Sequence, residues 1–215
     1  MSFEGLDHMF REDYLKGSLG ETDVDPDPMQ QFKLWFDAIV ECGTRQPNAM
    51  VLSTVDSEGV PSSRVVLLKD LTDEGFVFFT NYESEKGLAI QSHSTVSLLF
   101  YSIELERQIR ILGNASKVSY EDSNHYFQSR PFDSQIAAIT SHQSKLIESR
   151  SSLEDAFKKT IAQYKDESPQ CPSYWGGYIV KPHFFEFWQG RKSRFHDRIC
   201  YQKDQDSWSI FRKAP

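Results

Sequence analysis

The pattern of apolar and polar positions divides the chain into a helical stretch, a strand-rich stretch, a second helical stretch and a strand-rich end. The first 25 residues are polar and weakly patterned, which predicts a mobile arm or lid over 1–25. From Pro28 apolar residues recur at helical spacing, with Asp27 placed to cap the helix and Gly43 to end it. The predicted buried face of this helix consists of Met29, Phe32, Phe36, Ile39 and Val40.

Runs rich in Val, Leu, Ile and Phe follow, and they predict strands over 49–55, 60–69, 76–81, 95–103 and 107–118. The turn signals DSEG and TDEG separate the first three runs. Between the third and the fourth, SEKGLAIQSH predicts a short helix capped by Ser84. Short strands joined by tight turns favour an antiparallel meander that closes into a barrel, because closure removes the exposed edges.

Residues 119–165 return to a helical pattern. One helix is expected to stop at Pro131, a second to follow over 133–142, and a third to cover 151–164 with Ser151 and Glu154 as a capping box. The apolar face of the third helix would hold Leu153, Phe157, Ile161 and Tyr164. The chain ends in strand-like runs at 174–182, 183–189, 193–202 and 207–213. The sequence therefore predicts a mainly β fold with helices (α+β), with one domain over 26–215.

Composition and charge restrict the class of function. The 215 residues contain 24 Lys plus Arg against 31 Asp plus Glu, a formal net charge of −7. Any anion site must therefore be local, and a nucleic-acid binder would carry the opposite balance. Three cysteines form no CxxC pair, which suits a reducing compartment. No apolar run approaches the roughly 20 residues of a membrane helix, and the start shows no secretory pattern, so a cytoplasmic location is expected.

The strongest local concentration of positive charge is EFWQGRKSRFHDR, residues 186–198. If SRFHDRI is extended, Arg194, His196 and Arg198 project to one side, while Phe195 and Ile199 project to the other. A solvated outer strand would show the same alternation. Trp188 and Gly190 just upstream favour a pocket, because aromatic walls with a few polar anchors are typical of small-ligand sites.

Two further elements carry candidate anion ligands. Arg64 and Lys69 bracket an apolar run that predicts a buried strand, and their opposite parity implies two different ligands or a bulge. Tyr126, Arg130 and Ser134 recur at i, i+4 and i+8, and their side chains suit the oxygens of a phosphate monoester. The loop SHQS (141–144) is weaker support. Together these elements point to phosphorylated, aromatic small molecules and to chemistry supplied by a cofactor.

Other chemistries find no support in the sequence. There is no GxGxxG, no GxxxxGK[ST] and no GxSxG. The histidines lack metal-ligand spacing with cysteine or acidic partners, so no metal is expected.

Seven segments in order resemble one family, pyridoxamine 5′-phosphate oxidase: RVVLLK, FFTNYESEKG, ERQIRI, YFQSRPFDSQIAA, SHQS, SYWGGY and EFWQGRKSRFHDR. The resemblance runs from about residue 11 to the C-terminus. It implies an FMN-binding split β-barrel that works as a homodimer with two sites at the subunit interface. The implied reaction oxidises pyridoxamine or pyridoxine 5′-phosphate to pyridoxal 5′-phosphate, with O2 as electron acceptor and H2O2 as product.

The resemblance also implies a role for individual residues. The FMN site would be lined by Arg64, Val65, Val66, Leu67, Phe79, Thr80, Lys86, Gln108, Gln143, Ser144, Trp188 and Arg198. The substrate phosphate would be held by Lys69, Tyr126, Arg130 and Ser134. Arg194 and His196 would face the pyridine ring as the catalytic pair, and Arg11 to Tyr14 would fold over the substrate. Under this interpretation Arg64 and Lys69 serve two different phosphates.

The chain departs from the family pattern at two positions. Glu85 stands where the family usually has a phosphate-binding Arg, and Lys213 stands at a usually apolar C-terminal position. Three other functions stay open. A non-catalytic carrier or sensor of FMN or pyridoxal 5′-phosphate has Glu85 as its only support. A related flavin-barrel reductase for another substrate would not need YFQSRPFDS. A nucleic-acid-binding barrel is disfavoured by the net charge.

Overall fold

The structure is a computed structural model that describes residues 13–165 and 167–215. Contacts within the chain separate two compact units. The first contains the segment up to Pro47 together with Leu99–Ile111 and His183–Pro215, and the second contains Asn48–Leu98 and Leu112–Pro182. Arg11 and the start of the predicted arm lie outside the described residues.

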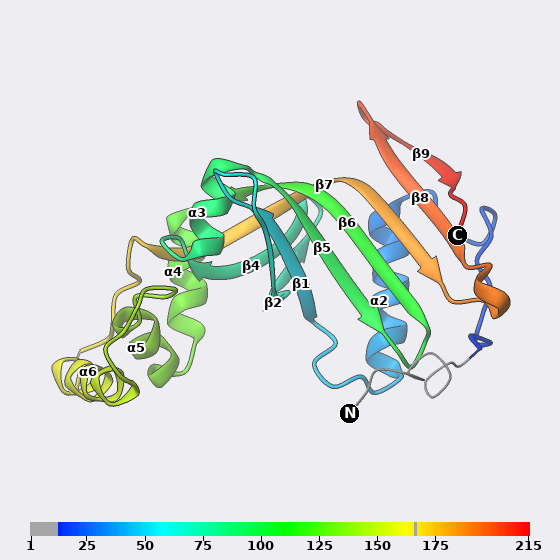
Figure 1. Ribbon diagram of the computed structural model, residues 1–215. Helices are drawn as coiled ribbons and strands as arrows, with labels where there is room; N and C mark the ends of the chain where they lie inside the picture. The colour runs from blue at the N-terminus through cyan, green and yellow to red at the C-terminus, as the bar shows by residue number, and fades with distance from the viewer. Residues whose placement is uncertain (1–12, 166) are drawn as a thin grey trace. The chain divides into compact units, whose positions relative to one another are not determined.

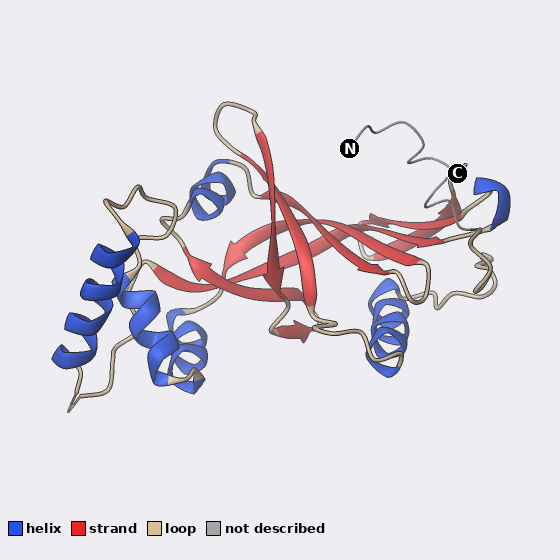
Figure 2. Cartoon of the chain, turned by 60° about the horizontal axis from the view of Figure 1, so that its bottom comes forward, coloured by secondary structure: helices blue, strands red, loops and turns tan. Residues whose placement is uncertain are grey.

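Nine strands of the described chain form one sheet, drawn in Figures 1 and 2. Seven lie in the order β2-β1-β5-β6-β7-β4-β3, while β8 pairs with β7 and β9 pairs with β8. The order is not the predicted meander, because β5 lies beside β1 and β7 lies beside β4. Two strand-like runs of the sequence also merge into one strand, β7 (Trp175–Gln189), which continues through Pro182.

The second unit contains two hairpins. β1 (Ala49–Val55) pairs antiparallel with β2 (Pro61–Leu67), and β3 (Asp70–Thr72) pairs antiparallel with β4 (Gly75–Asn81). β4 then pairs antiparallel with the first half of β7, from Phe76 opposite Val180 to Asn81 opposite Trp175. β5 (Thr95–Ser102) belongs to this unit up to Leu98, and β6 (Arg107–Lys117) belongs to it from Leu112. Alternating burial along β5 places Val96, Leu98 and Phe100 in the core.

Four helices accompany this unit: α3 (Glu85–Ser92), α4 (Tyr120–Ser129), α5 (Phe132–Thr140) and α6 (Arg150–Gln163). Ser84 caps α3 as predicted, by accepting a hydrogen bond from the Gly87 backbone N–H. Gly87 itself is required by close packing, because a Cβ there would overlap the backbone of Tyr82.

The start of α6 corrects one prediction. Ser149, not Ser151, caps the helix, and Ser152, not Glu154, completes the capping box. A run of serines offers several equivalent caps, so the sequence alone left the choice of register open. The predicted face of α6 is only half-buried, and the helix has no fully buried residue.

In the first unit, α2 (Pro28–Glu41) begins at the predicted cap, where the Asp27 carboxylate accepts a hydrogen bond from the Met29 backbone N–H at 2.9 Å. Gly43 follows the helix with a φ of 79°, which only glycine adopts without strain. Val40 is 48% exposed, contrary to the prediction, whereas Trp35 is buried and lies edge-on to Phe187 at 5.2 Å. The helix therefore packs on Phe32, Trp35 and Ile39.

The C-terminal hairpin completes the first unit. β8 (Asp197–Asp204) pairs antiparallel with the second half of β7 and with β9 (Ser207–Arg212). Lys213, the unexpected cation near the C-terminus, lies with its ammonium 4.8 Å from the centroid of the Phe184 ring. The position is therefore filled by a cation–π contact in place of an apolar side chain.

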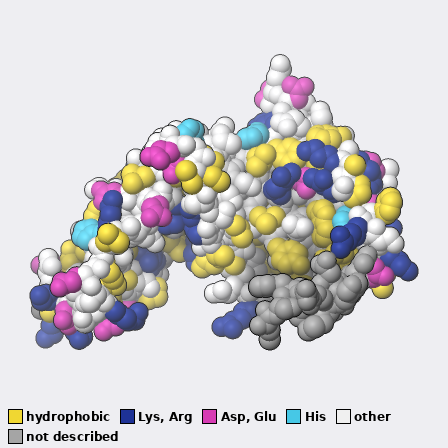
Figure 3. Space-filling view, viewed as in Figure 1, with side chains coloured by type: hydrophobic (Ala, Val, Ile, Leu, Met, Phe, Trp, Pro, Cys, Tyr) yellow, Lys and Arg dark blue, Asp and Glu magenta, His cyan; other side chains and the backbone are white. Residues whose placement is uncertain are grey.

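None of the helices in the described part of the chain is long and apolar enough to cross a membrane. On the face drawn in Figure 3, basic side chains are intermixed with acidic and apolar ones.

Candidate active site

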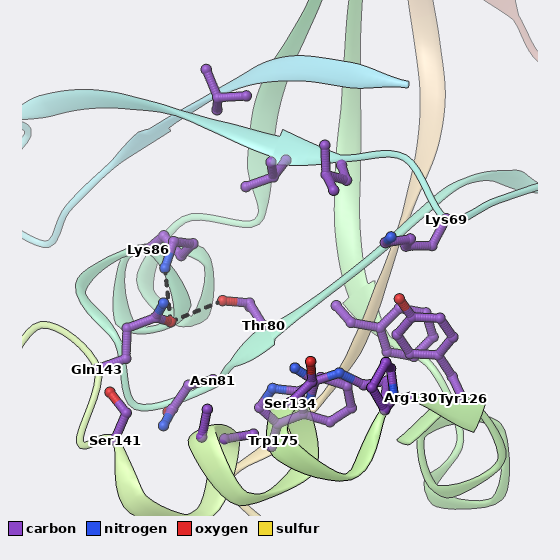
Figure 4. A pocket seen from close by; sticks show the side chains of 17 residues that line it. Lys69, Thr80, Asn81, Lys86, Tyr126, Arg130, Ser134, Ser141, Gln143 and Trp175 are labelled. Carbon is purple, nitrogen blue, oxygen red and sulfur yellow. Dashed lines mark hydrogen bonds between the residues drawn. The ribbon is translucent and has the colours of Figure 1, made fainter. Parts of the chain in front are cut away.

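The second unit contains a cavity of about 630 Å³, shown from close by in Figure 4. Its volume falls within the roughly 300–1,000 Å³ typical of small-molecule sites. β2, β4, α3, α4, α5, the loop after α5 and the start of β7 contribute to the wall. The lining residues are Val65, Val66, Leu67, Lys69, Phe79, Thr80, Asn81, Lys86, Tyr126, Arg130, Pro131, Ser134, Ala137, Ala138, Ser141, Gln143 and Trp175.

One wall of the cavity is a stack of aromatic rings. The rings of Phe79 and Tyr126 are stacked, with centroids 3.8 Å apart and an angle of 20° between their planes. The Trp175 ring lies 6.2 Å from that of Tyr126 and is parallel to it within 4°. The Lys69 ammonium lies 6.0 Å from the Tyr126 centroid, at the edge of cation–π range. These rings come from three separate segments, which the tertiary fold brings together.

Arg130 brings a guanidinium group into this wall. Its guanidinium carbon lies 4.6 Å from the Trp175 centroid, and Figure 4 shows it beside Ser134 and Tyr126. The Nη1 atom is buried and has no hydrogen-bond partner among the described residues. Burial lowers the pKa of Arg130 from its usual value. A buried, unpaired guanidinium donor is costly, and an anionic oxygen in the cavity would satisfy it.

A second polar cluster lines the cavity at Lys86. The Lys86 Nζ donates to Gln143 Oε1 at 3.0 Å and to Ser84 Oγ at 3.2 Å. Thr80 Oγ1 donates to the same Gln143 oxygen at 3.3 Å, as the dashed lines in Figure 4 mark. Burial lowers the pKa of Lys86, and the charge of Arg64 lowers it further. The cavity is thus lined by three cationic side chains, those of Lys69, Lys86 and Arg130.

Arg64 lies in the same unit but is not among the cavity-lining residues. Its Nη1 donates to the Leu52 carbonyl at 3.1 Å, to Thr54 Oγ1 at 2.8 Å and to the Ser62 carbonyl at 3.0 Å. These bonds anchor the guanidinium to β1 and β2. Burial lowers the pKa of Arg64, whereas the charge of Glu85 acts in the opposite direction. Glu85 is exposed and is the first residue of α3.

The segment that begins at Arg64 differs in two ways from the sequence prediction. β2 ends at Leu67, and the backbone N–H of Lys69 donates to the Val77 carbonyl at 2.8 Å. The strand therefore stops before Lys69, and strand parity does not relate Lys69 to Arg64. The apolar run is also not a buried strand in this chain, because Val65 is 66% exposed and Val66 and Leu67 are half-buried beside the cavity.

The first unit contains a separate aromatic cluster. The Trp188 and His196 rings lie 4.6 Å apart, and Tyr14 lies edge-on to both at 5.7 and 5.6 Å. His196 Nδ1 accepts a hydrogen bond of 3.0 Å from the Arg191 backbone N–H. The neutral ring therefore carries its proton on Nε2. Burial lowers the pKa of His196, the charge of Arg194 lowers it further, and Asp197 opposes them.

The local conformation corrects the prediction for SRFHDR. β8 begins only at Asp197, and Lys192–Arg194 forms a single 3-10 turn. Ser193 and Arg194 have φ values of 58° and 62°, so the chain is not extended there. Arg194 and His196 therefore do not share a strand face with Arg198, and Phe195 is 76% exposed instead of entering the core. The alternating charges resembled a strand, but the bend after β7 determines the backbone.

Arg198 is held by a buried carboxylate to which sequence analysis gave no role. Arg198 donates from Nε and Nη2 to Glu186 at 3.3 and 2.8 Å, and from Nη1 to the Ala214 carbonyl at 2.9 Å. Arg110 donates to the same carboxylate at 2.8 Å. Burial alone would raise the pKa of Glu186, but the two guanidinium groups outweigh it and hold that pKa below its usual value. A lone Glu among the aromatic residues of β7 was the available signal.

The predicted residues thus divide into three sets. The cavity brings together Val65, Val66, Leu67, Lys69, Phe79, Thr80, Lys86, Tyr126, Arg130, Ser134 and Gln143. The residues that do not line it are Arg64 and Ser144 in the same unit, and Tyr14, Gln108, Trp188, Arg194, His196 and Arg198 in the first unit. Arg11 is outside the described residues. Prediction missed Asn81 and Trp175, although the SYWGGY segment was an available signal for Trp175.

Comparison with known proteins identifies the family. The family model described as pyridoxamine 5′-phosphate oxidase matches residues 36–164, and the model of the pyridoxine 5′-phosphate oxidase C-terminal dimerisation region matches residues 175–215. Curated relatives named pyridoxine/pyridoxamine 5′-phosphate oxidase include one from a Cyanothece species, 47% identical over 95% of this chain and 96% of its own length. Another, from Paraburkholderia phymatum, is 50% identical over 95% and 97%.

Solved structures agree with this result. PhzG from Burkholderia lata 383, in complex with tetrahydrophenazine-1-carboxylic acid, superposes with a TM-score of 0.85 at 28% identity over 92% of this chain and 98% of its own. A pyridoxamine 5′-phosphate oxidase-related, FMN-binding protein from Nostoc punctiforme gives a TM-score of 0.67 at 17% identity, over 89% and 100% of the two chains. The second likeness concerns the fold alone.

The fold is therefore an antiparallel split β-barrel flanked by helices, as predicted, the fold class of the pyridoxamine 5′-phosphate oxidase-like proteins. Within that class, the chain belongs to the pyridoxamine 5′-phosphate oxidase family, and it includes the family's C-terminal dimerisation region.

Proposed function

We propose that the protein is an FMN-dependent oxidase of pyridoxamine 5′-phosphate and pyridoxine 5′-phosphate. The product is pyridoxal 5′-phosphate, O2 accepts the two electrons and becomes H2O2, and the amine substrate also consumes water and releases ammonia. The observation that carries the proposal is the cluster of Lys69, Tyr126, Arg130 and Ser134 around one cavity, because a guanidinium, an ammonium and two hydroxyls suit a phosphate monoester.

The residues of the second unit fit FMN as well. Lys86, Thr80 and Gln143 form a polar cluster in the cavity, and Val65, Val66 and Leu67 provide an apolar surface beside it. We propose that these residues, with Phe79, Arg64 and Ser144, contact FMN. The FMN roles of Gln108, Trp188 and Arg198, which lie in the first unit, stay predictions. The flavin ring would pack on the apolar surface, and the FMN phosphate would be bound by the cations.

When bound, FMN supplies the acceptor for the hydride that leaves C4′ of the substrate. The chain's own contribution is to hold the substrate. Charge-assisted hydrogen bonds from Lys69 and Arg130 fix its phosphate, which limits the motion of the ring at the other end. In this proposal Arg194 and His196 face the pyridine ring. Because Nδ1 of His196 accepts the Arg191 N–H, the Nε2–H is the donor left for the substrate.

We further propose a homodimer with its two sites at the subunit interface, for which the dimerisation region of residues 175–215 is the support. Asp13 and Tyr14 are the described part of the segment proposed to fold over the substrate, and Tyr14 lies beside Trp188 and His196. The mobile arm over 1–25 and the cytoplasmic location stay predictions.

The first experiment is a visible absorption spectrum of the purified protein with added FMN, followed by anaerobic addition of pyridoxamine 5′-phosphate. We expect the flavin absorption to bleach and then to return when air is admitted, with one H2O2 per turnover. Bound flavin that never bleaches would favour a carrier or sensor instead of an oxidase. Failure to bind FMN at all would contradict the proposal at its first step.

The likeness to PhzG favours one second candidate, oxidation of a partly reduced phenazine carboxylic acid. The same cuvette distinguishes the two candidates, because a phenazine precursor carries no phosphate. If such a compound bleaches the flavin faster than pyridoxamine 5′-phosphate does, the substrate assignment is wrong.

Arg194→Ala separates the proposed roles of the two arginines. This variant is expected to lower turnover and substrate affinity and to retain FMN, whereas Arg198→Ala is expected to lose FMN. If Arg194→Ala abolished flavin retention, the division of roles between Arg194 and Arg198 would be wrong.

A further inference from the structure

The corner between α4 and α5 places three of the proposed phosphate ligands, Tyr126, Arg130 and Ser134. Arg130 ends α4 with φ −76° and ψ 150°, and Pro131 precedes α5 with φ −53° and ψ 143°. Two extended residues thus separate the helices, and Pro131 provides no side-chain cap for α5. The direction of the Arg130 side chain depends on how this short corner is held.

Gln135 holds the corner from the α5 side. Its Nε2 donates to the Arg130 carbonyl at 2.9 Å and to the Gln128 carbonyl at 3.3 Å. Carbonyls at the C-terminus of a helix lack intrahelical partners, and this amide supplies partners from the next helix. Gln135 is only 6% exposed. It does not line the cavity, so its role toward a ligand is indirect.

Few contacts of its own hold the guanidinium of Arg130 in place. It lies over Trp175 at 4.6 Å, and it forms no ion pair within the described chain. Its buried Nη1 has no hydrogen-bond partner in those same residues. The backbone corner, the Trp175 ring and the more distant Phe127 ring, 5.9 Å from the guanidinium carbon, therefore determine where the guanidinium points. A shift of the corner would therefore move the guanidinium.

We propose that Gln135 is a positioning residue, which fixes the α4–α5 corner so that Arg130 meets the substrate phosphate. The inference rests on the proposed function for the identity of the ligand. The positioning itself concerns only Gln135, Arg130 and Trp175.

The test compares Gln135→Met with Gln128→Met. Methionine keeps the length of glutamine and removes the amide. Gln128 is a matched control, because its Nε2 also donates to a backbone carbonyl, that of Pro169 at 2.8 Å. Its own bond with Gln135 uses the backbone carbonyl, which the substitution keeps. The Gln135 variant is expected to raise KM for pyridoxamine 5′-phosphate about tenfold, by the loss of two modest hydrogen bonds. The control is expected to leave KM within about twofold, and both variants should retain FMN.

A double-mutant cycle with Arg130→Ala shows whether Gln135 acts through Arg130. If it does, Gln135→Met raises KM no further in the Arg130→Ala background, whereas independent effects would multiply. Multiplying effects, an unchanged KM in the Gln135 variant, or an equal rise in the Gln128 control would each overturn the inference.

A crystal structure of the Gln135→Met variant keeps the inference testable if the protein proves to have another substrate. We expect the guanidinium of Arg130 to leave its position over Trp175. A guanidinium still seated at 4.6 Å would contradict the positioning role regardless of the substrate. Wild-type protein that lacks oxidase activity would contradict the proposed function. The position of the Arg130 guanidinium in the variant structure would still test the inference about Gln135.

Discussion

The buried carboxylate of Glu186 provides a sharp test of how the first unit is stabilised. Its side chain is 9% exposed and accepts hydrogen bonds from Arg110 and Arg198, at distances between 2.8 and 3.3 Å. Replacing Glu186 by Gln keeps the shape and removes the charge. Two guanidinium groups then face a neutral amide, which no longer offsets the full free-energy cost of removing them from water.

The expected loss can be worked from these contacts. Hydrogen bonds to charged groups contribute about 1.5–3 kcal/mol each, and an amide oxygen keeps part of that contribution. The Arg110 side chain is 40% exposed, so solvent screening reduces its share. We expect Glu186→Gln to lower the free energy of unfolding by about 2 kcal/mol. For a chain of this size that corresponds to a Tm about 4–8 °C lower.

The stabilisation that Glu186 contributes depends on pH. The folded state lowers the pKa of Glu186, so the stabilisation is present above the unfolded pKa of about 4.3 and is lost as pH falls through the folded pKa. The wild type and Glu186→Gln should therefore differ most at neutral pH and converge in acid.

The assay is thermal and urea unfolding at a fixed protomer concentration, at pH 7 and at a series of pH values below the unfolded pKa. Glu154→Gln is the matched control, because its ion pair with Arg150 is equally short at 2.8 Å but has side chains 89% and 54% exposed. The control should lose at most about 0.5 kcal/mol. A Glu186 variant as stable as the control at pH 7 would refute this account of the Arg110–Glu186–Arg198 cluster.

Three further outcomes are expected. Arg130→Ala should raise KM for the phosphorylated substrate about 100-fold, because it removes a charge-assisted hydrogen bond to the phosphate. The variant should retain FMN. An equal loss of FMN affinity in a fluorescence titration would contradict the assignment of Arg130 to the substrate phosphate. Glu85→Gln should tighten FMN binding about two- to fivefold at low salt, because it removes an exposed negative charge. The effect should decrease at high salt. An unchanged FMN affinity at low salt would show that the Glu85 carboxylate does not repel the flavin phosphate. The pKa of His196 is lowered from its usual value, so the rise of KM that accompanies its protonation should occur at a lower pH than for an ordinary histidine. A His196→Asn variant should lack that rise, and a rise already present at pH 7.5 would contradict the lowered pKa.

Local physical chemistry in the sequence determined most elements. Asp27 and Pro28 set the start of α2, Ser84 set the start of α3, and β-branched runs set β1, β4 and β5, because caps and strand patterns act within a few residues. The motif resemblance identified the family that the comparisons then established. Local signals were ambiguous at α6, where consecutive serines compete for one cap, and at SRFHDR, where alternating charge resembles a strand.

Only the tertiary structure decided which distant residues meet. The stacked rings of Phe79, Tyr126 and Trp175 come from β4, α4 and β7, and no sequence spacing encodes their 3.8–6.2 Å separations. Glu186 between Arg110 and Arg198, and Gln135 under Arg130, are likewise contacts between elements. Propensity and capping act locally along the chain, whereas burial, stacking and charge pairing depend on how the strands pair. The elements could therefore be predicted from the sequence, but the residues that position the proposed ligands could not.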